Sequence, residues 1–192
     1  MAKVCGIVLG AGASRRLGRP KQSLPLGDTT LLGWVMRDVE ASALERVVLV
    51  TGGAAAESIA GLALSRAVVA HNDAYGSGCA SSLLAGLDAA GDADAIMLLL
   101  GDMPGVDADA IDAVRAQWER AGPWGMATRY EDGLGHPFVF ARAAYPVLRS
   151  LHGDKAVWKL LDRMDAAELA RPLPRDVDTW EDYEAVRARL AA

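Results

Sequence analysis

Short, largely apolar runs alternate along the chain with longer segments in which apolar residues recur every three or four positions. The runs Val4–Leu9, Arg46–Thr51 and Ala95–Leu100 are rich in apolar residues, and a glycine follows each of them. Such runs predict strands that are buried on both faces of a sheet. A further strand is expected over Ala67–His71.

The segments between these strands predict helices. Apolar residues gather on one face of a helix over 31–41, and Thr30 is its expected N-cap. Helices are also expected over 55–62, over 81–90, and from Asp107 or Asp109 to Trp118. Strands that alternate with helices and are apolar throughout predict a parallel sheet covered on both faces.

Beyond Gly122 the pattern is less regular. Short strands are expected over 126–129 and 137–140, separated by the turn-rich E-D-G-L-G, and helices over 143–150, 154–162 and 179–190. Aromatic residues in this half are expected mainly in the core, although they also offer side chains that shape a pocket. Without a repeat or a linker, residues 1–192 predict one α/β domain, with a Rossmann-like, mostly parallel sheet and helices on both faces.

Composition excludes several classes of function. The 192 residues are 52% hydrophobic and 23% charged, which excludes an intrinsically disordered chain. The net charge of −5 argues against a nucleic-acid-binding domain, which would normally be basic. Two cysteines and three scattered histidines do not make a structural zinc site, and no apolar run approaches the roughly 20 residues of a membrane span. With no signal peptide at the start, we expect a cytoplasmic protein that binds neither nucleic acid nor membrane.

A basic, glycine-rich segment follows the first strand: L-G-A-G-A-S-R-R-L-G-R-P-K, residues 9–21. Ligands of open α/β sheets bind beyond the carboxyl ends of the strands, where this segment is expected. Its glycines let backbone N–H groups approach an anion, and its arginines and Lys21 add positive charge. The segment lacks the third glycine of a dinucleotide fingerprint and the G-K-[ST] of a P-loop. The alternative is a solvated basic loop.

A carboxylate stands directly after the strand over 95–100, in the sequence L-G-D-M-P. At this edge of the sheet Asp102 is a candidate ligand for Mg²⁺, which prefers hard oxygen donors and substrate phosphates. The alternative is that Asp102 only caps the following turn.

These motifs resemble those of molybdenum cofactor cytidylyltransferases and their MobA-like NTP transferase relatives, whose phosphate loop reads L-A-A-G-x-S-x-R-x-G-x-P-K. The chain departs from that loop at Gly10 and Leu17. The resemblance continues through N-D-A-Y-G-S-G-C-A-S-S-L-L-A-G-L from Asn72, G-H-P from Gly135, G-D-K from Gly153 and D-V-D-T-W-E-D-Y from Asp176. It spans nearly the whole chain and implies the fold of nucleotide-diphospho-sugar transferases.

The resemblance also implies a set of site residues. The implied catalytic residues are Arg16, Lys21 and Asp102. The implied nucleotide site comprises Leu9, Gly10, Ala11, Gly12, Arg16, Lys21, Thr51, Gly52, Gly78, Ser81 and Ser82. The implied acceptor side comprises His136, Asp154 and Lys155, and the implied Mg²⁺ ligands are Asp102 and Asp178. The alternatives are structural: serines that cap a helix start, an ordinary hydrogen-bonded His136, and Asp176 and Asp178 that, with Thr179, only cap the last helix.

The implied function is transfer of CMP from CTP to the phosphate of molybdopterin, with release of pyrophosphate and Mg²⁺ as cofactor. Pro20 before Lys21 favours CTP over GTP, because the guanylyl enzymes carry Asp at the position of Pro20. The product would pass to a molybdoenzyme or its chaperone. The same chemistry with GTP or with another acceptor, such as a sugar phosphate or methylerythritol phosphate, stays open, and so does a non-catalytic nucleotide-binding regulatory protein.

Overall fold

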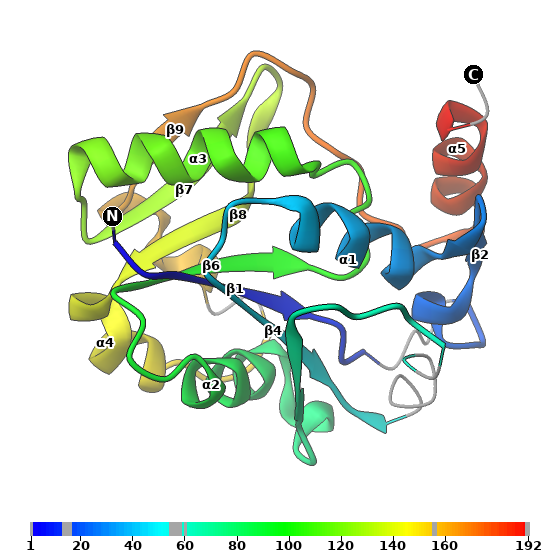
Figure 1. Ribbon diagram of the computed structural model, residues 1–192, viewed down its shortest axis with the longest axis horizontal. Helices are drawn as coiled ribbons and strands as arrows, with labels where there is room; N and C mark the ends of the chain where they lie inside the picture. Colours follow the sequence, from blue (N-terminus) through cyan, green and yellow to red (C-terminus); the bar gives the residue numbers. More distant parts are fainter. Residues whose placement is uncertain (1, 13–16, 54–58, 60, 155–156, 191–192) are drawn as a thin grey trace.

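A twisted sheet of seven strands forms the centre of the molecule (Figure 1). The computed structural model describes residues 2–12, 17–53, 59, 61–154 and 157–190. In the sheet the strands follow the order β5-β4-β1-β6-β8-β7-β9. The strands are β1 (Val4–Leu9), β4 (Arg46–Thr51), β5 (Ala67–His71), β6 (Ala95–Leu100), β7 (Gly125–Tyr130), β8 (Gly133–Ala141) and β9 (Asp165–Glu168), and β2 (Pro25–Leu26) pairs separately with β3 (Thr29–Thr30).

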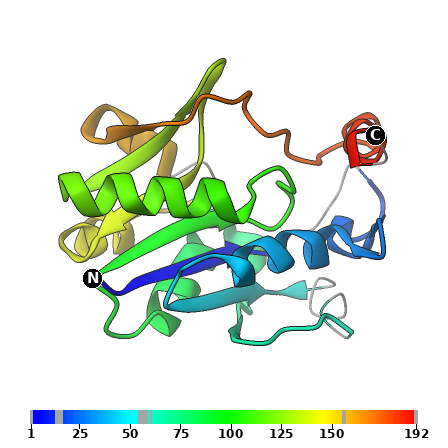
Figure 2. The ribbon, with the colours of Figure 1, turned by 45° about the horizontal axis from the view of Figure 1, so that its top comes forward.

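Helices cover both faces of the sheet (Figure 2). The α-helices are α1 (Leu31–Ala41), α2 (Cys79–Ala89), α3 (Ala108–Ala121), α4 (Tyr145–Arg149) and α5 (Trp180–Leu190), and the 3₁₀ helices are η1 (Lys21–Ser23), η3 (Tyr75–Ser77), η4 (Arg142–Ala144) and η5 (Val157–Arg163). In the part of the chain that the structure describes, no helix has the length and apolar character needed to cross a membrane.

The alternation of side chains along the strands divides the core into two layers. On β1, Val4 and Val8 point to the layer formed with α1 and α3, whereas Cys5 and Ile7 point to the layer formed with α2, α4 and η5. All four of these β1 side chains are fully buried. The strands that the sequence predicts as apolar throughout are therefore covered on both faces, as expected from a parallel sheet between helices.

The first half of the chain confirms the predicted elements. β1, β4, β5 and β6 are parallel neighbours, and α1 has the predicted bounds. The side chains of Thr30 and Asp107 accept hydrogen bonds from the backbone N–H groups three residues further on and so cap α1 and α3. β5 differs from a buried strand because it lies at the edge of the sheet, where Val68 and Val69 are exposed. The helix predicted over 55–62 falls largely outside the described residues.

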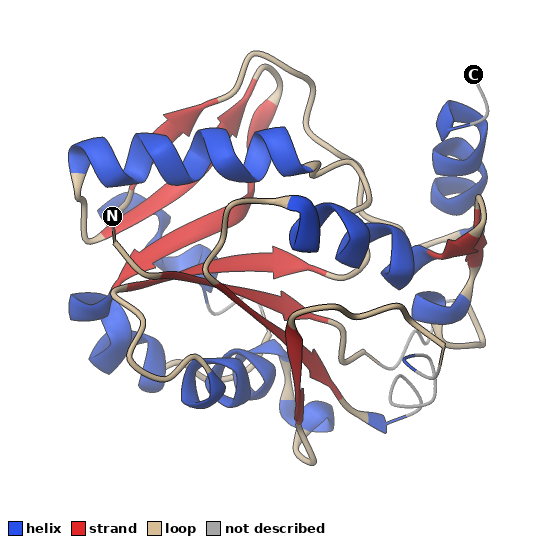
Figure 3. Ribbon diagram, in the orientation of Figure 1, coloured by secondary structure: helices blue, strands red, loops and turns tan. Residues whose placement is uncertain are grey.

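The second half departs from the prediction (Figure 3). β8 is antiparallel to both β6 and β7 and begins at Gly133, so the segment expected to be a turn shortens to Glu131 and Asp132. β9 was not predicted, because its sequence D-A-A-E carries no β-branched residue; pairing with the edge of β7 makes it a strand. In place of a helix over 154–162 the structure has the 3₁₀ helix η5.

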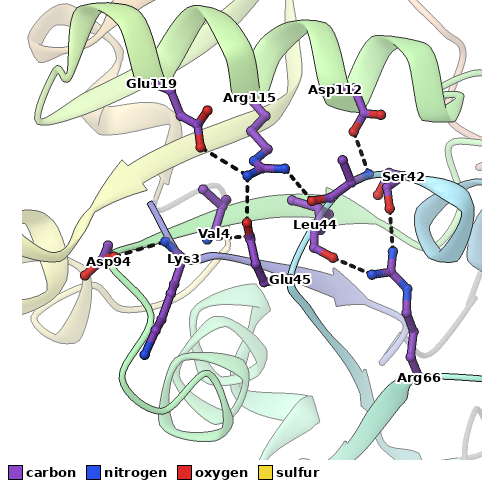
Figure 4. Close-up of polar contacts among 11 residues, drawn as sticks. Lys3, Val4, Ser42, Leu44, Glu45, Arg66, Asp94, Asp112, Arg115 and Glu119 are labelled. Atoms are coloured by element: carbon purple, nitrogen blue, oxygen red, sulfur yellow. Dashed lines mark hydrogen bonds and ion pairs between the residues drawn. The ribbon is translucent and has the colours of Figure 1, made fainter. Parts of the chain in front are cut away.

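Two arginines fix the entry into β4 (Figure 4). Arg66 donates hydrogen bonds to the backbone carbonyls of Ser42, at 2.6 Å, and of Leu44. Arg115 of α3 is 4% exposed and pairs with the Glu45 carboxylate at 2.6 Å. Because the carbonyls of a turn need partners when they are covered, these bonds hold the start of β4 against the rest of the sheet.

A small third core lies where the chain ends. It consists of Leu17, Leu24, Leu26, Leu31, Val177 and Tyr183, which join the β2–β3 pair, α1 and α5. The backbone N–H of Val177 donates to the carbonyl of Asp102 at 2.9 Å. The C-terminal segment is thereby tied to the loop after β6, at the end of the sheet toward which β1 and β6 point (Figure 1).

Candidate active site

A cavity of about 610 Å³ opens at the carboxyl ends of β1 and β6. Its walls come from the segment after β1, the start of α2, the loop after β6, β8, η5 and the segment before α5. The predicted site residues that line it are Leu9, Ala11, Gly12, Lys21, Gly78, Ser82, Asp102, His136, Asp154 and Asp178. Arg16 and Lys155 lie outside the described residues.

Three of these residues converge at one end of the cavity. The Lys21 ammonium lies 2.5 Å from Oδ2 of Asp102 and 2.9 Å from Oδ1 of Asp178. The three side chains are far apart in the sequence, and two oxygens within hydrogen-bond distance of one nitrogen must also lie near each other. We call Lys21, Asp102 and Asp178 the charged end of the cavity.

Local structure explains why these side chains meet. Pro20 precedes η1, and its carbonyl accepts a hydrogen bond from the Ser23 N–H at 3.3 Å, which shapes the turn that carries Lys21. Asp178 precedes Thr179, whose hydroxyl accepts from the Asp182 N–H at 3.2 Å while the Asp182 carboxylate accepts from the Thr179 N–H at 2.9 Å. This reciprocal pair is a capping box, and it confirms Thr179 as the cap of α5.

Asp102 and Asp178, whose side chains are 21% and 36% exposed, give the charged end an affinity for cations. Burial, together with the charges of Asp176 and Asp178, raises the pKa of Asp102, although Lys21 opposes that rise. Burial lowers the pKa of Lys21, but the two carboxylates outweigh it, so that the pKa of Lys21 is raised. A buried carboxylate is costly in its charged form unless cations surround it. The site therefore favours a bound cation beside Asp102.

Only part of the predicted phosphate loop lines the cavity. Ala11 and Gly12 line the cavity. Gly10 packs against β4 instead: its N–H donates to the Val50 carbonyl at 2.8 Å, and its own carbonyl accepts from the Gln22 amide at 2.9 Å. Gln22 is buried, lines the cavity and was not predicted; its position directly after Lys21 is the one signal that points to it.

The residues expected around the nucleobase also lie partly inside and partly outside the cavity lining. Ser82 lines the cavity, whereas Thr51, Gly52 and Ser81 are not among its lining residues. The Tyr75 ring lies over the glycines after β4, since a Cβ built on Gly52 would come within 2.9 Å of the Tyr75 Cβ. Tyr75 itself lines the cavity and was not predicted.

Asn72 organises the serines at the start of α2. Its side-chain amide donates to the hydroxyls of Ser81 and Ser82, each at 2.9 Å, and its backbone N–H donates to the Thr51 carbonyl at 2.8 Å. Asn72 is buried, so these bonds hold α2 against the end of β4. The asparagine that opens the predicted motif thus has a structural role in placing Ser82.

A second group of lining residues, His136 and Asp154, belongs to the predicted acceptor side. The imidazole of His136 stacks on Phe138 with ring centroids 4.2 Å apart, and burial lowers the pKa of His136 to about 3, so the ring is neutral. The Asp154 carboxylate accepts a hydrogen bond from the Cys79 N–H at 3.0 Å and so binds the first turn of α2. Trp158 lines the cavity beside them. We call the rings of His136 and Trp158, together with the buried Phe138 that contacts both, the aromatic end of the cavity.

The donor set at the charged end fits a magnesium ion. Mg²⁺ is commonly held by one or two carboxylates, with substrate phosphates and waters completing its coordination. Asp102 and Asp178 supply two carboxylates that converge on one point. In the described part of the chain no cluster of three or more His, Cys, Asp or Glu side chains is placed to hold a metal ion, so a cage made by protein alone is not present there.

Comparisons with known proteins identify the family of the chain. The family model of the MobA-like NTP transferase domain matches residues 6–168. The comparison with curated protein sequences gave no match.

Solved structures resemble the whole chain. Rv0371c from Mycobacterium tuberculosis H37Rv is 40% identical with a TM-score of 0.84, covering 97% of this chain and 98% of that one. A structure of Rv0371C in complex with manganese gives 38% identity and a TM-score of 0.80 over 97% of this chain and 98% of that one. At 15% identity, CMP:2-keto-3-deoxy-manno-octonic acid synthetase complexed with CTP shares the fold, with a TM-score of 0.80 over 99% of both chains.

These findings confirm the predicted α/β fold of nucleotide-diphospho-sugar transferases with its mostly parallel sheet. The family match covers most of the chain and includes the phosphate loop, the loop after β6 and the strands between them. The chain belongs to the MobA-like NTP transferase family, and it is a nucleotidyltransferase.

Proposed function

We propose that the protein transfers CMP from CTP to the phosphate of molybdopterin and releases pyrophosphate. The observation that carries this proposal is the convergence of Lys21, Asp102 and Asp178 at one end of a cavity at the carboxyl edge of the sheet. A cation and two carboxylates there suit a triphosphate that arrives with a divalent metal.

The proposed reaction needs no protein nucleophile. A phosphate oxygen of the acceptor attacks the α-phosphorus of CTP; the new P–O bond forms as the bond to the β-phosphate oxygen breaks, and pyrophosphate leaves with the electron pair. Catalysis then consists of holding the two phosphates in line and neutralising the charge that develops on them. The Lys21 ammonium and the backbone around Ala11 and Gly12, which line the cavity, would supply that neutralisation.

Asp102 and Asp178 would hold Mg²⁺, and a bound magnesium ion supplies charge neutralisation and orientation for the phosphates. Both carboxylates now pair with Lys21. If a divalent ion takes these oxygens, the ammonium loses its partners there and becomes available to phosphate oxygens within the reach of its flexible side chain. The same three residues would thus serve the enzyme before and after its substrate binds.

The preference for CTP rests on the phosphate loop and on the polar groups near β4. Pro20 precedes Lys21, as in the cytidylyltransferases that the loop resembles. Ser82, held by Asn72, offers a small polar side chain inside the cavity beside Leu9. A site that satisfies the hydrogen-bonding edge of one base discriminates against a base that leaves those groups unpaired.

The test is to incubate the protein with Mg²⁺, molybdopterin and each of the four NTPs in turn, and to identify the products by mass spectrometry. The proposal predicts the cytosine dinucleotide of molybdopterin and an equal amount of pyrophosphate, both absent with Asp102→Ala. A guanine dinucleotide as main product would overturn the base assignment. Transfer to a sugar phosphate or methylerythritol phosphate but not to molybdopterin would overturn the acceptor. Nucleotide binding without any pyrophosphate release would indicate a regulatory protein.

A further inference from the structure

Trp158 stands out in the cavity because it is large, apolar and accessible at once. Its residue is 39% exposed, whereas Phe138 beside it is fully buried and His136 is 5% exposed. Trp158 and Asp102 line the same cavity, Trp158 from η5 and Asp102 from the loop after β6. An exposed indole in a cavity that also holds charged side chains offers a ligand a large apolar surface, which makes it a candidate contact.

The neighbouring rings fix the orientation of Trp158 without covering it. Its ring makes an interplanar angle of 79° with Phe138, at a centroid distance of 5.3 Å, and 75° with His136, at 6.0 Å. Both contacts are edge-to-face, and among the described residues no ring lies parallel to the indole. Phe138 and His136 therefore support Trp158, and they leave a parallel stack to be made by something else.

Other exposed aromatic side chains have different surroundings. Trp180 is 43% exposed, but it packs against Tyr183 and under the Arg19 guanidinium and does not line the cavity. Tyr75 lines the cavity but lies over Gly53. Within the described part of the chain, Trp158 is the exposed tryptophan that lines the cavity.

We infer that Trp158 is a positioning residue for the acceptor, and that it stacks its indole on a flat heteroaromatic ring which the acceptor carries beyond its phosphate. The inference rests on the proposed function, in which the phosphate of the acceptor binds at the charged end of the cavity. The aromatic end offers a planar apolar surface and an uncharged imidazole, while the Asp154 carboxylate accepts from the Cys79 N–H. This surface suits a pterin better than a sugar phosphate, which would need several hydrogen-bonding groups for its hydroxyls.

Steady-state kinetics of Trp158→Ala, Trp158→Phe and the control Trp180→Ala test the inference. Stacking of a base on an aromatic side chain contributes enough that its loss should raise the KM for molybdopterin about tenfold in Trp158→Ala. The KM for CTP should stay within about twofold, and Trp158→Phe should recover most of the acceptor affinity, because a smaller ring still stacks. Trp180→Ala should match the wild type. A molybdopterin KM in Trp158→Ala equal to that of Trp180→Ala would overturn the inference and leave the transferase function standing.

A binding measurement separates the inference from the proposed function. Calorimetry without nucleotide would compare a pterin carrying a phosphate on its side chain with glucose 1-phosphate. We expect the phosphopterin to bind about tenfold more weakly to Trp158→Ala than to the wild type, and glucose 1-phosphate to be unaffected. This result would support the role of Trp158 even if no acceptor released pyrophosphate. Equal phosphopterin affinities, or an equal loss for the sugar phosphate, would overturn it.

Discussion

The two ends of the cavity are built by different means. At the charged end, single atoms matter: one ammonium lies 2.5 Å and 2.9 Å from two carboxylates that reach it from distant parts of the chain. At the aromatic end, surfaces matter: three rings from β8 and η5 meet at centroid distances of 4.2 to 6.0 Å, and the histidine among them is neutral.

Under the proposed function, the charged end serves the transfer step and the aromatic end serves recognition of the acceptor. Charge neutralisation at a reacting phosphate depends on specific atoms at specific places, so conservative changes at the charged end should lower kcat. Stacking depends on area and planarity, so one ring can replace another at the aromatic end, and changes there should act mainly on the acceptor KM. Variants at the two ends should therefore fall into two kinetic classes.

The largest effect is expected from Asp102→Asn. The change is nearly isosteric and leaves the backbone carbonyl that accepts from Val177 in place, but it removes an anionic metal ligand. We expect kcat to fall about 1,000-fold or more, with an unchanged thermal unfolding midpoint. Rates of pyrophosphate release and circular dichroism would measure the two. Near-normal turnover at saturating Mg²⁺ would show that Asp102 is not a ligand of the metal.

A smaller loss is expected from Lys21→Ala. The KM for CTP should rise and kcat should fall, giving a loss of about 100-fold in kcat/KM, because the ammonium serves both bound substrate and transition state. The variant should also bind Mn²⁺ more tightly than the wild type when no nucleotide is present, since Asp102 and Asp178 lose the cation that pairs with them. Electron paramagnetic resonance of free Mn²⁺ would measure this affinity. Weaker Mn²⁺ binding would contradict the shared-carboxylate arrangement.

Asp178→Asn should lower kcat about tenfold, less than Asp102→Asn, because water can partly replace one ligand on a metal that keeps several waters. The matched control is Glu181→Gln, three residues away, exposed and outside the lining of the cavity. Mg²⁺ titrations of the initial rate should show a raised metal requirement for Asp178→Asn and none for the control. Equal behaviour of the two variants would leave Asp178 with a capping role only.

At the aromatic end, an effect on stability rather than on turnover is expected from His136. Burial lowers the pKa of His136 to about 3, whereas an unfolded histidine titrates near 6.5. Between these values the unfolded chain binds the extra proton, so His136 contributes stability that is complete above about pH 6.5 and is lost as the pH falls toward 3. From pH 7 to 4.5 the wild type should lose about 2–3 kcal/mol more than His136→Gln.

Urea unfolding at the two pH values would measure this difference. The control is His152→Gln, the same substitution at an exposed histidine outside the lining of the cavity. If His136→Gln lost stability with acid as steeply as the wild type, the imidazole would not be held neutral in the folded protein.

Sequence patterns predicted the sheet best where each strand is apolar on both faces. β1, β4 and β6 follow from this property alone, since their side chains alternate between two buried layers. β9 follows from no local property, because Ala167 is buried by pairing with β7 rather than by its own β propensity. Strand pairing between distant segments leaves little trace in a single sequence.

The same contrast holds for the site. Lys21, Asp102 and Asp178 carry charge and stand in distinctive sequence motifs, so the motifs predict them as site residues, and the structure brings the three side chains together. Gln22 carries no such mark, because a glutamine after a lysine is an ordinary local sequence. Trp158 is one of the aromatic residues of the second half that were expected mainly in the core and only secondarily in a pocket. Their place in the cavity depends on packing between elements that are distant in the sequence.

The most direct test of the central claim is a crystal structure with Mn²⁺ and a CTP analogue whose α–β bridging oxygen is replaced by methylene. Anomalous scattering would locate the metal ion directly. The account predicts one strong peak within coordination distance of Asp102 and Asp178, with the triphosphate between that peak and Lys21 and the side of the cavity at Trp158 left open. A metal bound elsewhere, or a triphosphate lying against Trp158 and His136, would contradict it.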